Sequence, residues 1–483
     1  MSLLLVPLLP LAAALLSLLP AGRRLASAAT LLADLTALAL AGRAALAVAA
    51  AGRLIAVPGW VELDGLGALL LALSTFVAVT AALFSWGYVG RHDHRDARAR
   101  LYYFHFNLFT FALLLVPVLA EPALTWIAIE FTAVFSVLLV AFDDTHESLE
   151  AAWKYIALMF MGAAIALLGF FILFWAQQTV GGGEYSWAGL RLMAARLPLP
   201  MVTAAFVLVL IGFGTKAGIV PLHTWLPDAH SQAPSPVCAL LSGVKTTTAL
   251  YALLRLVPLL PVASVDAWLR IAGLVSVGVA AFLLIQVRDY KRLFAYSTVE
   301  HMGIVLVGVG LGGPAATYAA MLQLVNHGLT KAFCFLAAGA VLLALGTREI
   351  ASVRGLIRSS PSAGAALLFG ALAIGGAPPF ALFLSEFSIF RAGLEQRQYV
   401  VTALLVAFIT IAFFAILLHV NRMVFGPAAE PAERPTAGAK LPASALAALA
   451  VAAVPVAVLG LYQPGSLHAL ATLAASSLLP VSP

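Results

Sequence analysis

The sequence predicts an all-α integral membrane protein with about fourteen transmembrane helices. Of its 483 residues, 63% are hydrophobic and only 10% are charged, and the mean hydropathy is +1.03. A soluble domain could not cover that much apolar surface. Apolar runs of membrane-spanning length also recur along the whole chain. The net charge of +6 resides mainly in the short breaks between these runs, which indicates membrane topology rather than nucleic-acid binding.

Each apolar run has roughly the 20 residues that cross a bilayer. We expect the spans, in chain order, at residues 3–20, 25–43, 65–89, 101–119, 122–142, 151–176, 200–220, 236–258, 265–286, 296–312, 314–345, 362–383, 399–424 and 441–462.

The distribution of Lys and Arg predicts the orientation. Sixteen fall in breaks after odd-numbered spans and eight after even-numbered spans, and the other three lie within spans. By the positive-inside rule the odd breaks are cytoplasmic, so both termini face the outer side. One cytoplasmic break holds His92 and His94 at a metal-like spacing, which we interpret as part of a solvated loop. Cys238 and Cys334 lie in separate apolar runs and indicate neither a metal site nor a disulfide.

The fifth span contains a lone carboxylate, Glu130, with apolar residues on both sides. An ionisable group inside a membrane span is a functional candidate by default, although a structural ion pair with a neighbouring helix is the alternative. Glu150 and Lys154, at the start of the sixth span, are four residues apart on one helical face. They are consistent with a pair that only stabilises the helix.

The seventh and eighth spans are the most unusual part of the chain. Five Gly and Pro residues interrupt the segment between Gly212 and Pro227. Lys216 lies inside this interrupted segment, and Lys245 lies inside the apolar run that follows. Broken backbone and a cation at membrane depth both require protein or water partners, so together they predict an ion path.

Three further titratable groups follow. His301 lies inside the tenth span, after Glu300, and could relay protons because histidine titrates near neutral pH; a neutral, hydrogen-bonded structural histidine is the alternative. His327 and Lys331, in the eleventh span, are four residues apart and share one helical face.

The twelfth span is interrupted by Gly375, Gly376, Pro378 and Pro379, and the carboxylate of Glu386 follows soon after. Two interrupted segments five spans apart predict two inverted five-helix repeats, with discontinuous helices 7 and 12. Lys216 and Glu386 are then expected at matching positions. We expect four regions: helices 1–3 at residues 1–100, the first repeat at 101–258, the second repeat at 259–424, and helix 14 at 425–483.

Four stretches together resemble the antiporter-like subunits of respiratory complex I. They are GFGTKAGIVPLHTWLPDAHSQAPSPVCALLSG, DYKRLFAYSTVEHMG, NHGLTKAF and GGAPPFALFLSEF. The EHMG variant, the HGLTKA run and GTREIASVRGL most resemble the F-type membrane subunit of hydrogenase-4 and formate hydrogenlyase complexes. The large subunits of Mrp sodium/proton antiporters are also similar.

This resemblance implies a fourteen-helix core and a function in proton transfer. Glu130 matches the family's fifth-helix glutamate, Lys216 its seventh-helix lysine and Lys245 its eighth-helix lysine. His327 and Lys331 match an eleventh-helix relay, and Glu386 a twelfth-helix position that is Lys or Glu in the family. Together with His301, these residues are our proton-transfer candidates.

The chain has no Cys cluster for an iron–sulfur centre and no dinucleotide fingerprint, so we expect no cofactor of its own. The resemblance implies other membrane subunits and a peripheral redox arm as partners, in a bacterial or archaeal cytoplasmic membrane, with protons as the transported ion and sodium as the alternative. Three alternatives stay open: an Mrp-type antiporter subunit, a proton-flux coupling subunit of an inorganic-carbon uptake complex, and a structural membrane spacer.

Overall fold

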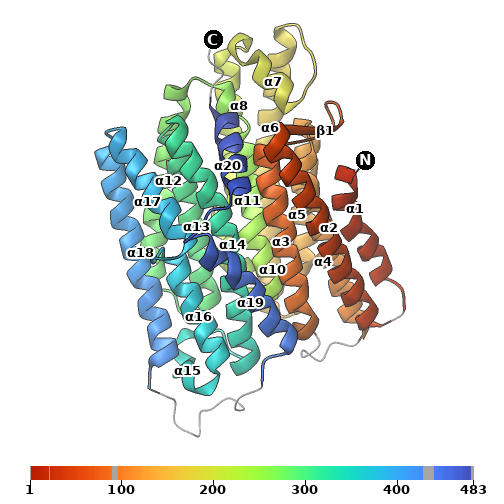
Figure 1. Ribbon diagram of the computed structural model, residues 1–483, viewed down its shortest axis with the longest axis vertical. Coiled ribbons are helices and arrows are strands. Elements are labelled where there is room, and N and C mark those ends of the chain that lie inside the picture. Colours follow the sequence, from red (N-terminus) through yellow and green to blue (C-terminus); the bar gives the residue numbers. More distant parts are fainter. Residues whose placement is uncertain (1, 21, 90–95, 428–439, 480–483) are drawn as a thin grey trace.

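A computed structural model describes residues 2–20, 22–89, 96–427 and 440–479 and confirms an all-α membrane architecture (Figure 1). The helices run side by side in one elongated bundle. The first helix, α1 (Ser2–Ser17), begins near the same end of the bundle at which the last helix, α20 (Gly465–Leu478), finishes. His92 and His94 lie outside the described residues, so their interpretation stays a prediction.

The N-terminal part combines long helices with a short hairpin. After α1 come α2 (Arg23–Ala51), β1 (Arg53–Val57), β2 (Val61–Asp64) and α3 (Gly65–Tyr88). β1 and β2 pair antiparallel, which sets Arg53 opposite Asp64. The hairpin was not among the predicted elements, because its strands are only a few residues long and lie in a break between apolar runs.

The middle of the chain contains the first interrupted segment. Its elements are α4 (Asp96–Leu115), η1 (Val116–Val118), α5 (Pro122–Val140), α6 (His146–Thr179), α7 (Trp187–Met193), η2 (Ala194–Arg196), α8 (Leu199–Ala217), α9 (Trp225–Gln232), α10 (Ser235–Leu240), η3 (Leu241–Lys245) and α11 (Thr246–Leu254). The η3 segment is a π-helical turn between α10 and α11. Such turns are rare and occur frequently at functional sites.

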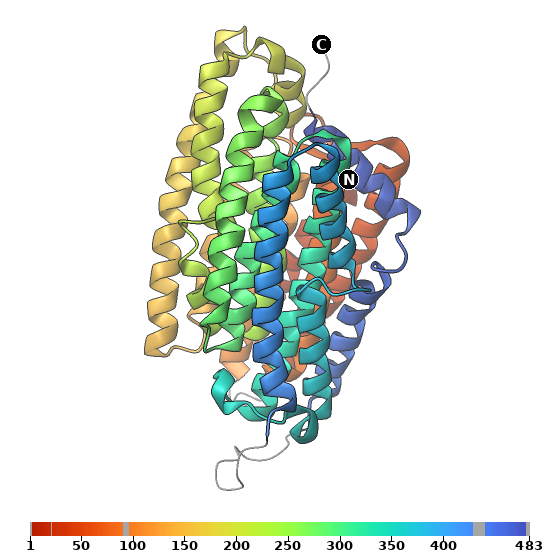
Figure 2. The same cartoon turned by 90° about the vertical axis from the view of Figure 1, so that its left-hand side faces the viewer.

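The last part of the chain repeats the pattern of long helices around an interruption. Its elements are η4 (Val257–Leu259), α12 (Val262–Ile285), α13 (Tyr290–Gly310), α14 (Gly313–Leu345), η5 (Ile350–Ser352), α15 (Leu356–Ser359), α16 (Pro361–Ile374), α17 (Ala381–Glu395), α18 (Tyr399–Phe425), α19 (Ala443–Val458) and α20. The break between α16 and α17 lies midway along the bundle, and α19 and α20 follow one another along it (Figure 2). α20 was also not predicted.

Helix caps explain why two helices begin earlier than their apolar runs predict. Thr145 and Ser148 form a reciprocal capping box, with N–H···Oγ distances of 2.9 and 3.1 Å, which starts α6 at His146. Asp289 accepts hydrogen bonds from the backbone N–H groups of Lys291 and Arg292 and starts α13 at Tyr290. The predicted starts at residues 151 and 296 are therefore several residues late.

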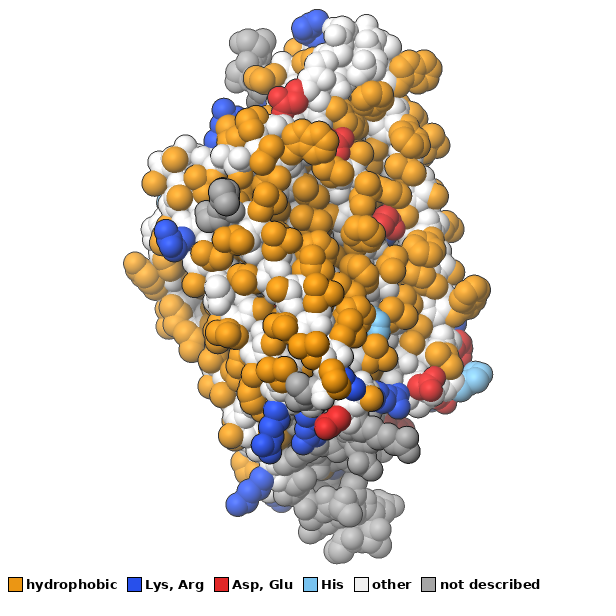
Figure 3. All heavy atoms as spheres, turned by 90° about the vertical axis from the view of Figure 1, so that its right-hand side faces the viewer, with side chains coloured by type: hydrophobic (Ala, Val, Ile, Leu, Met, Phe, Trp, Pro, Cys, Tyr) orange, Lys and Arg blue, Asp and Glu red, His pale blue; other side chains and the backbone are white. Residues whose placement is uncertain are grey.

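The surface of the bundle identifies a multi-pass membrane protein. Among the described residues, eleven helices are long and apolar enough to cross a membrane, and shorter apolar helices lie at Leu3–Ser17, Pro361–Ile374 and Ala443–Val458. Hydrophobic side chains cover the middle of the face shown in Figure 3, and most of its Lys and Arg lie toward the lower end. An apolar middle with charged side chains toward the ends is the surface pattern of a protein that spans a bilayer.

Candidate functional site

The ammonium of Lys216 and the carboxylate of Glu130 form an ion pair inside the bundle. Lys216 Nζ lies 3.0 Å from Glu130 Oε2, and the two side chains are 1% and 12% exposed. Lys216 comes from the last turn of α8 and Glu130 from the middle of α5. Glu130 Oε1 has no hydrogen-bond partner among the described residues. The second carboxylate oxygen of Glu130 is therefore free to accept a hydrogen bond beside the Lys216 ammonium.

The break after α8 is closed by its own hydrogen bonds. Gly218 adopts the left-handed conformation (φ 82°) that terminates the helix. The N–H of Ile219 then donates to Gly214 O at 2.8 Å, and the indole N–H of Trp225 donates to Thr215 O at 2.8 Å. These bonds satisfy carbonyls that the helix end leaves free, so the chain can turn at this depth.

The ammonium of Lys245 lies in an aromatic cage and forms no ion pair with a described residue. Its Nζ lies 4.3 Å from the ring centre of Tyr155 and 4.6 Å from that of Trp225, with Met159 Sδ at 3.3 Å. Both distances are within the range of cation–π attraction. Tyr155 comes from α6 and Trp225 from α9, so the cage connects Lys245 to the first turn after the break.

The π-helical turn that ends at Lys245 also contacts the second half of the protein. Ser242 Oγ and Thr298 Oγ1, the latter on α13, are 2.6 Å apart. Gly243 packs against Gly328 of α14 so closely that a Cβ on Gly243 would lie 2.7 Å from Gly328 O. The two helices approach backbone to backbone because both residues lack a side chain.

A second polar cluster surrounds His301. Its Nδ1 lies 3.6 Å from Glu386 Oε1. The amide of Gln323 bridges the two, at 3.0 Å from His301 Nδ1 and 3.4 Å from Glu386 Oε1. His301 Nε2 lies 3.1 Å from Ile374 O, the carbonyl at the end of α16. The cluster therefore joins α13, α14 and α17 at the second break.

His327 and Lys331 extend this cluster along α14. The ring centres of His301 and His327 are 5.3 Å apart. Lys331 Nζ donates to Phe294 O and to Ser297 Oγ, both on α13. His327 and Lys331 therefore face the same neighbouring helix, as their spacing of four residues predicts. Ser297 directly precedes Thr298, the partner of Ser242, so a polar line runs from η3 to the second cluster.

The break between α16 and α17 positions the Glu386 carboxylate. Gly376 has a φ of 74°, and a Cβ built on it would lie 2.3 Å from Glu386 Oε2. A glycine is thus required both by the backbone conformation and by the carboxylate lying over it. The α19–α20 break packs here as well, since a Cβ on Gly460 would overlap Pro379 O.

The structure brings the predicted residues together in three groups: Glu130 with Lys216, Lys245 in its cage, and His301 with His327, Lys331 and Glu386. One positional prediction is wrong. Lys216 lies before the break in its segment, whereas Glu386 lies after the break in its own. The two side chains therefore do not occupy matching positions.

Several site residues were missed. Tyr155, Trp225 and Gln323 carry no signal of their own in an apolar sequence, because only their contacts give them a role. Asp34 had the same signal as Glu130, a lone carboxylate in an apolar run. It is fully buried in α2, and neither of its carboxylate oxygens has a hydrogen-bond partner among the described residues.

Charged residues also hold α9 at the end of the bundle opposite the termini. Lys291 Nζ donates to Ser231 O and Ala233 O at 3.0 and 2.6 Å, and Arg348 Nη1 donates to Ser231 O at 2.7 Å. Cations that bind the last carbonyls of a helix also interact favourably with the negative end of the helix dipole. Lys154, which pairs with Glu150 at 2.6 Å as predicted, additionally reaches Asp228 of α9 at 3.4 Å.

Comparison with known proteins identifies the family. The model of the NADH:quinone oxidoreductase/Mrp antiporter transmembrane family matches residues 121–413. The chain belongs to this family. All seven proton-transfer candidates lie within the matched region. The chain is 38% identical to the hydrogenase-4 component F homolog of Methylacidiphilum infernorum over 374 residues, which cover 75% of this chain and 78% of that relative.

Solved structures show the same fold. One is a chain of the membrane-bound sulfane sulfur reductase, an archaeal respiratory membrane complex, with a TM-score of 0.88, 24% identity, and coverage of 99% of this chain and 98% of that chain. Another is a chain of the Mrp complex from Dietzia sp., with a TM-score of 0.87, 22% identity, and coverage of 99% and 97%. These similar chains sit in multi-subunit membrane complexes.

Proposed function

We propose that this chain is the proton-translocating membrane subunit of a redox-driven complex of the hydrogenase-4 or NADH-quinone oxidoreductase kind. The observation that carries the proposal is the buried ion pair of Lys216 and Glu130 beside an interrupted helix. Ionisable groups inside apolar helices are expensive to maintain, and they mark ion pathways in membrane proteins.

The pair can act as a proton switch. An ammonium buried without a partner is disfavoured, and a carboxylate at ion-pair distance restores it. Movement of Glu130 away from Lys216, or loss of the charge on Glu130, would therefore release a proton from Lys216 Nζ. The cage of Lys245 stabilises a cation through two aromatic rings and not through an ion pair with a described residue, which suits a group that carries a proton only transiently.

The remaining candidates extend the path laterally. From Lys245 the polar line continues through the Ser242–Thr298 contact to Lys331, which donates to Ser297. His327 and His301 follow at ring-contact distance. Glu386, joined to His301 through Gln323, would connect the path to the outer side. A redox arm carried by other subunits would supply the driving force.

The contacts also support two inverted five-helix repeats within a fourteen-helix core, with discontinuous helices 7 and 12. In the first repeat, Glu130 of the second helix contacts Lys216 of the interrupted fourth helix. In the second, His301 of the second helix contacts Glu386 of the interrupted fourth helix. We keep residues 101–258 and 259–424 as the repeats, 1–100 as the N-terminal helices and 425–483 as the C-terminal helix region.

We infer a bacterial or archaeal cytoplasmic membrane from the similar proteins, and the excess of Lys and Arg in the breaks after odd-numbered spans supports an orientation with both termini outside. Lys291, Arg292 and Arg348 would then lie at the cytoplasmic end, where they bind α9.

Affinity purification from native membranes, followed by mass spectrometry of the co-purifying chains, tests the proposal. A hydrogenase-like or quinone-reductase-like arm in stoichiometric amount is the expected result. Recovery of small membrane chains alone would contradict the redox-driven reading.

An Mrp-type sodium/proton antiporter subunit is the second candidate, because the family model and the fold include Mrp chains. Sodium-dependent proton exchange in liposomes without an electron donor would favour it.

A further inference from the structure

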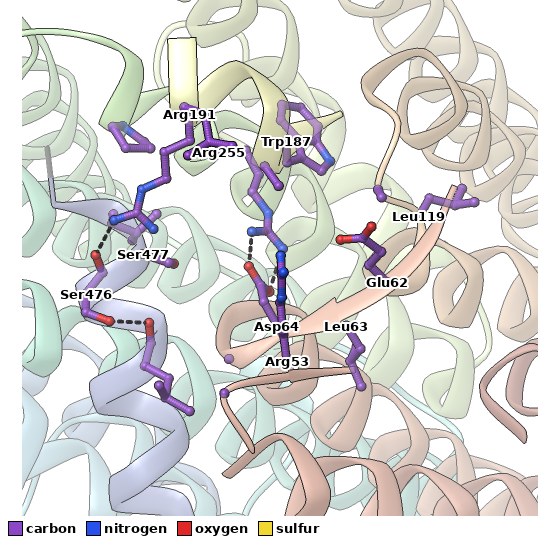
Figure 4. A pocket seen from close by; sticks show the side chains of 18 of the residues that line it. Arg53, Glu62, Leu63, Asp64, Leu119, Trp187, Arg191, Arg255, Ser476 and Ser477 are labelled. Atoms are coloured by element: carbon purple, nitrogen blue, oxygen red, sulfur yellow. Dashed lines mark hydrogen bonds and ion pairs between the residues drawn. The ribbon is translucent and has the colours of Figure 1, made fainter. Parts of the chain in front are cut away.

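A second polar site lies at the end of the bundle where both termini are found, away from the proton-transfer candidates. A cavity of about 590 Å³ opens between the β1–β2 hairpin, α7, the end of α11 and the C-terminal turns of α20 (Figure 4). Its volume falls within the range of about 300–1,000 Å³ typical of small-molecule sites. None of the seven candidate residues lines it.

Arginines enter this cavity from three different elements. Arg255 comes from the C-terminal end of α11, Arg53 from the hairpin and Arg191 from α7 (Figure 4). Arg191 donates to Ser476 O and Leu479 O at 2.9 and 3.3 Å. Arg255 forms a bidentate pair with Asp64. Arg53 is exposed; its backbone lies opposite Asp64 in the hairpin, and its guanidinium forms no ion pair or hydrogen bond with any described residue.

Several N–H donors in the cavity wall are left without acceptors. Arg191 Nε, Arg255 Nε and Trp187 Nε1 are buried atoms with no hydrogen-bond partner among the described residues. Trp187 is only 8% exposed. Buried donors are rarely left unpaired in folded proteins, so three around one cavity indicate a missing acceptor.

Both carboxylates in the cavity wall accept hydrogen bonds from the protein itself. Asp64 accepts from Arg255 and, at 2.9 Å, from the N–H of Gly67. Glu62 Oε1 accepts from the N–H of Gly59 at 3.0 Å. Burial lowers the pKa of Arg191, and Asp64 only partly offsets this. Three arginines line the cavity with only two carboxylates, so the lining has an excess of positive charge and of unpaired N–H donors.

We infer that this cavity binds the phosphate group of an anionic ligand, either a phospholipid headgroup or free phosphate. Guanidinium groups match phosphate oxygens in charge and in bidentate geometry. The cavity lies at the ends of α2 and α20 and the start of α3, which is the headgroup level of a bilayer. Apolar lining residues such as Leu119 and Leu473 would contact the acyl chains of a lipid.

Ligand binding to the full chain in its purified complex tests this site. After detergent washing, the complex would be titrated separately with phosphatidylglycerol and with inorganic phosphate, and thermal unfolding would be measured. We expect protection of the unmodified protein, and at least a tenfold higher half-saturating concentration for Arg191→Gln and Arg53→Gln. Arg391→Gln removes an exposed arginine that pairs with Glu395 and lies outside the cavity, so it should bind like the unmodified protein.

The two sources of phosphate give different results. Protection by phosphatidylglycerol that inorganic phosphate does not displace identifies a lipid headgroup, and protection by inorganic phosphate alone identifies the free anion. Because Arg191 also donates hydrogen bonds to carbonyls at the end of α20, Arg191→Gln by itself could lose binding through a local structural change. Arg53→Gln breaks no side-chain hydrogen bond or ion pair with a described residue. Equal protection of Arg53→Gln, Arg391→Gln and the unmodified protein would overturn the proposal.

Discussion

Lys216 Nζ and Glu130 Oε2 lie 3.0 Å apart in the interior of the bundle, less than one turn before α8 ends at Ala217. An ion pair and a helix end at the same place make the pair sensitive to any movement of the break. This relationship between a titratable pair and an interrupted helix is the basis of the proposed mechanism.

Glu130→Gln should remove proton transport and destabilise the protein. Lys216 would then lose its counter-charge and with it the ion pair, and removal of one partner from a buried ion pair typically costs about 3–5 kcal/mol. Thermal unfolding and proton uptake in liposomes measure the two effects. The double variant Glu130→Gln/Lys216→Met removes both charges, so it should recover stability but not transport. Recovery of transport in the double variant would contradict a role for the pair.

The aromatic cage of Lys245 gives a second prediction. Tyr155→Leu removes a ring that lies 4.3 Å from Lys245 Nζ, a contact worth about 0.5–2 kcal/mol. We expect proton transport to fall several-fold. Tyr155→Phe is the matched control, because it keeps the ring and removes only the hydroxyl that bonds Ser136. If Phe and Leu reduce transport equally, the ring is not the important feature.

Substitution of Gly376 tests the second break. Gly376→Ala forces a side chain into a left-handed residue and places its Cβ against Glu386 Oε2, so it should displace the carboxylate and abolish transport. Gly346→Ala is matched to it, since φ is 70° there and no heavy atom lies within 4 Å of the added Cβ. That control should lose only about 1–2 kcal/mol of stability, the usual strain of a left-handed residue. Comparable transport in both variants would disprove the role assigned to Gly376.

Much of this arrangement could be predicted from the sequence because membrane spans and their interruptions depend on local composition. Glu130, Lys216 and Glu386 are conspicuous as ionisable residues in apolar surroundings, and each is buried as expected. Asp34 carried the same signal and was overlooked.

The partners of these residues could not be predicted, because they come from distant segments. Lys245 meets Tyr155 from α6 and Trp225 from α9 only after the helices pack. The hairpin at residues 53–64 and helix α20 depend on tertiary contacts rather than on a long apolar pattern. The cavity that they line could therefore not be predicted from the sequence either.

The pair of Asp64 and Arg255 predicts a pH dependence of stability. Burial alone would raise the pKa of Asp64, but Arg255 more than offsets this and the pKa is lowered. A lowered carboxyl pKa contributes stability above the ordinary value of about 3.9, and this contribution is lost as the pH falls through the folded-state pKa.

Asp64→Asn should therefore reduce stability by about 2 kcal/mol at pH 7, the usual scale for a charged hydrogen bond. The difference from the unmodified protein should shrink below about pH 4. Unfolding in detergent between pH 3 and pH 8 measures it, and a difference that persists unchanged at the lowest pH would contradict the pairing.

Proton translocation by Lys216→Ala, measured in the purified and reconstituted complex, tests the central claim most directly. The account predicts that the complex assembles with all its subunits and keeps electron transfer in its redox arm, while proton movement coupled to that reaction is lost. Intact proton pumping in the assembled Lys216→Ala complex would contradict the account.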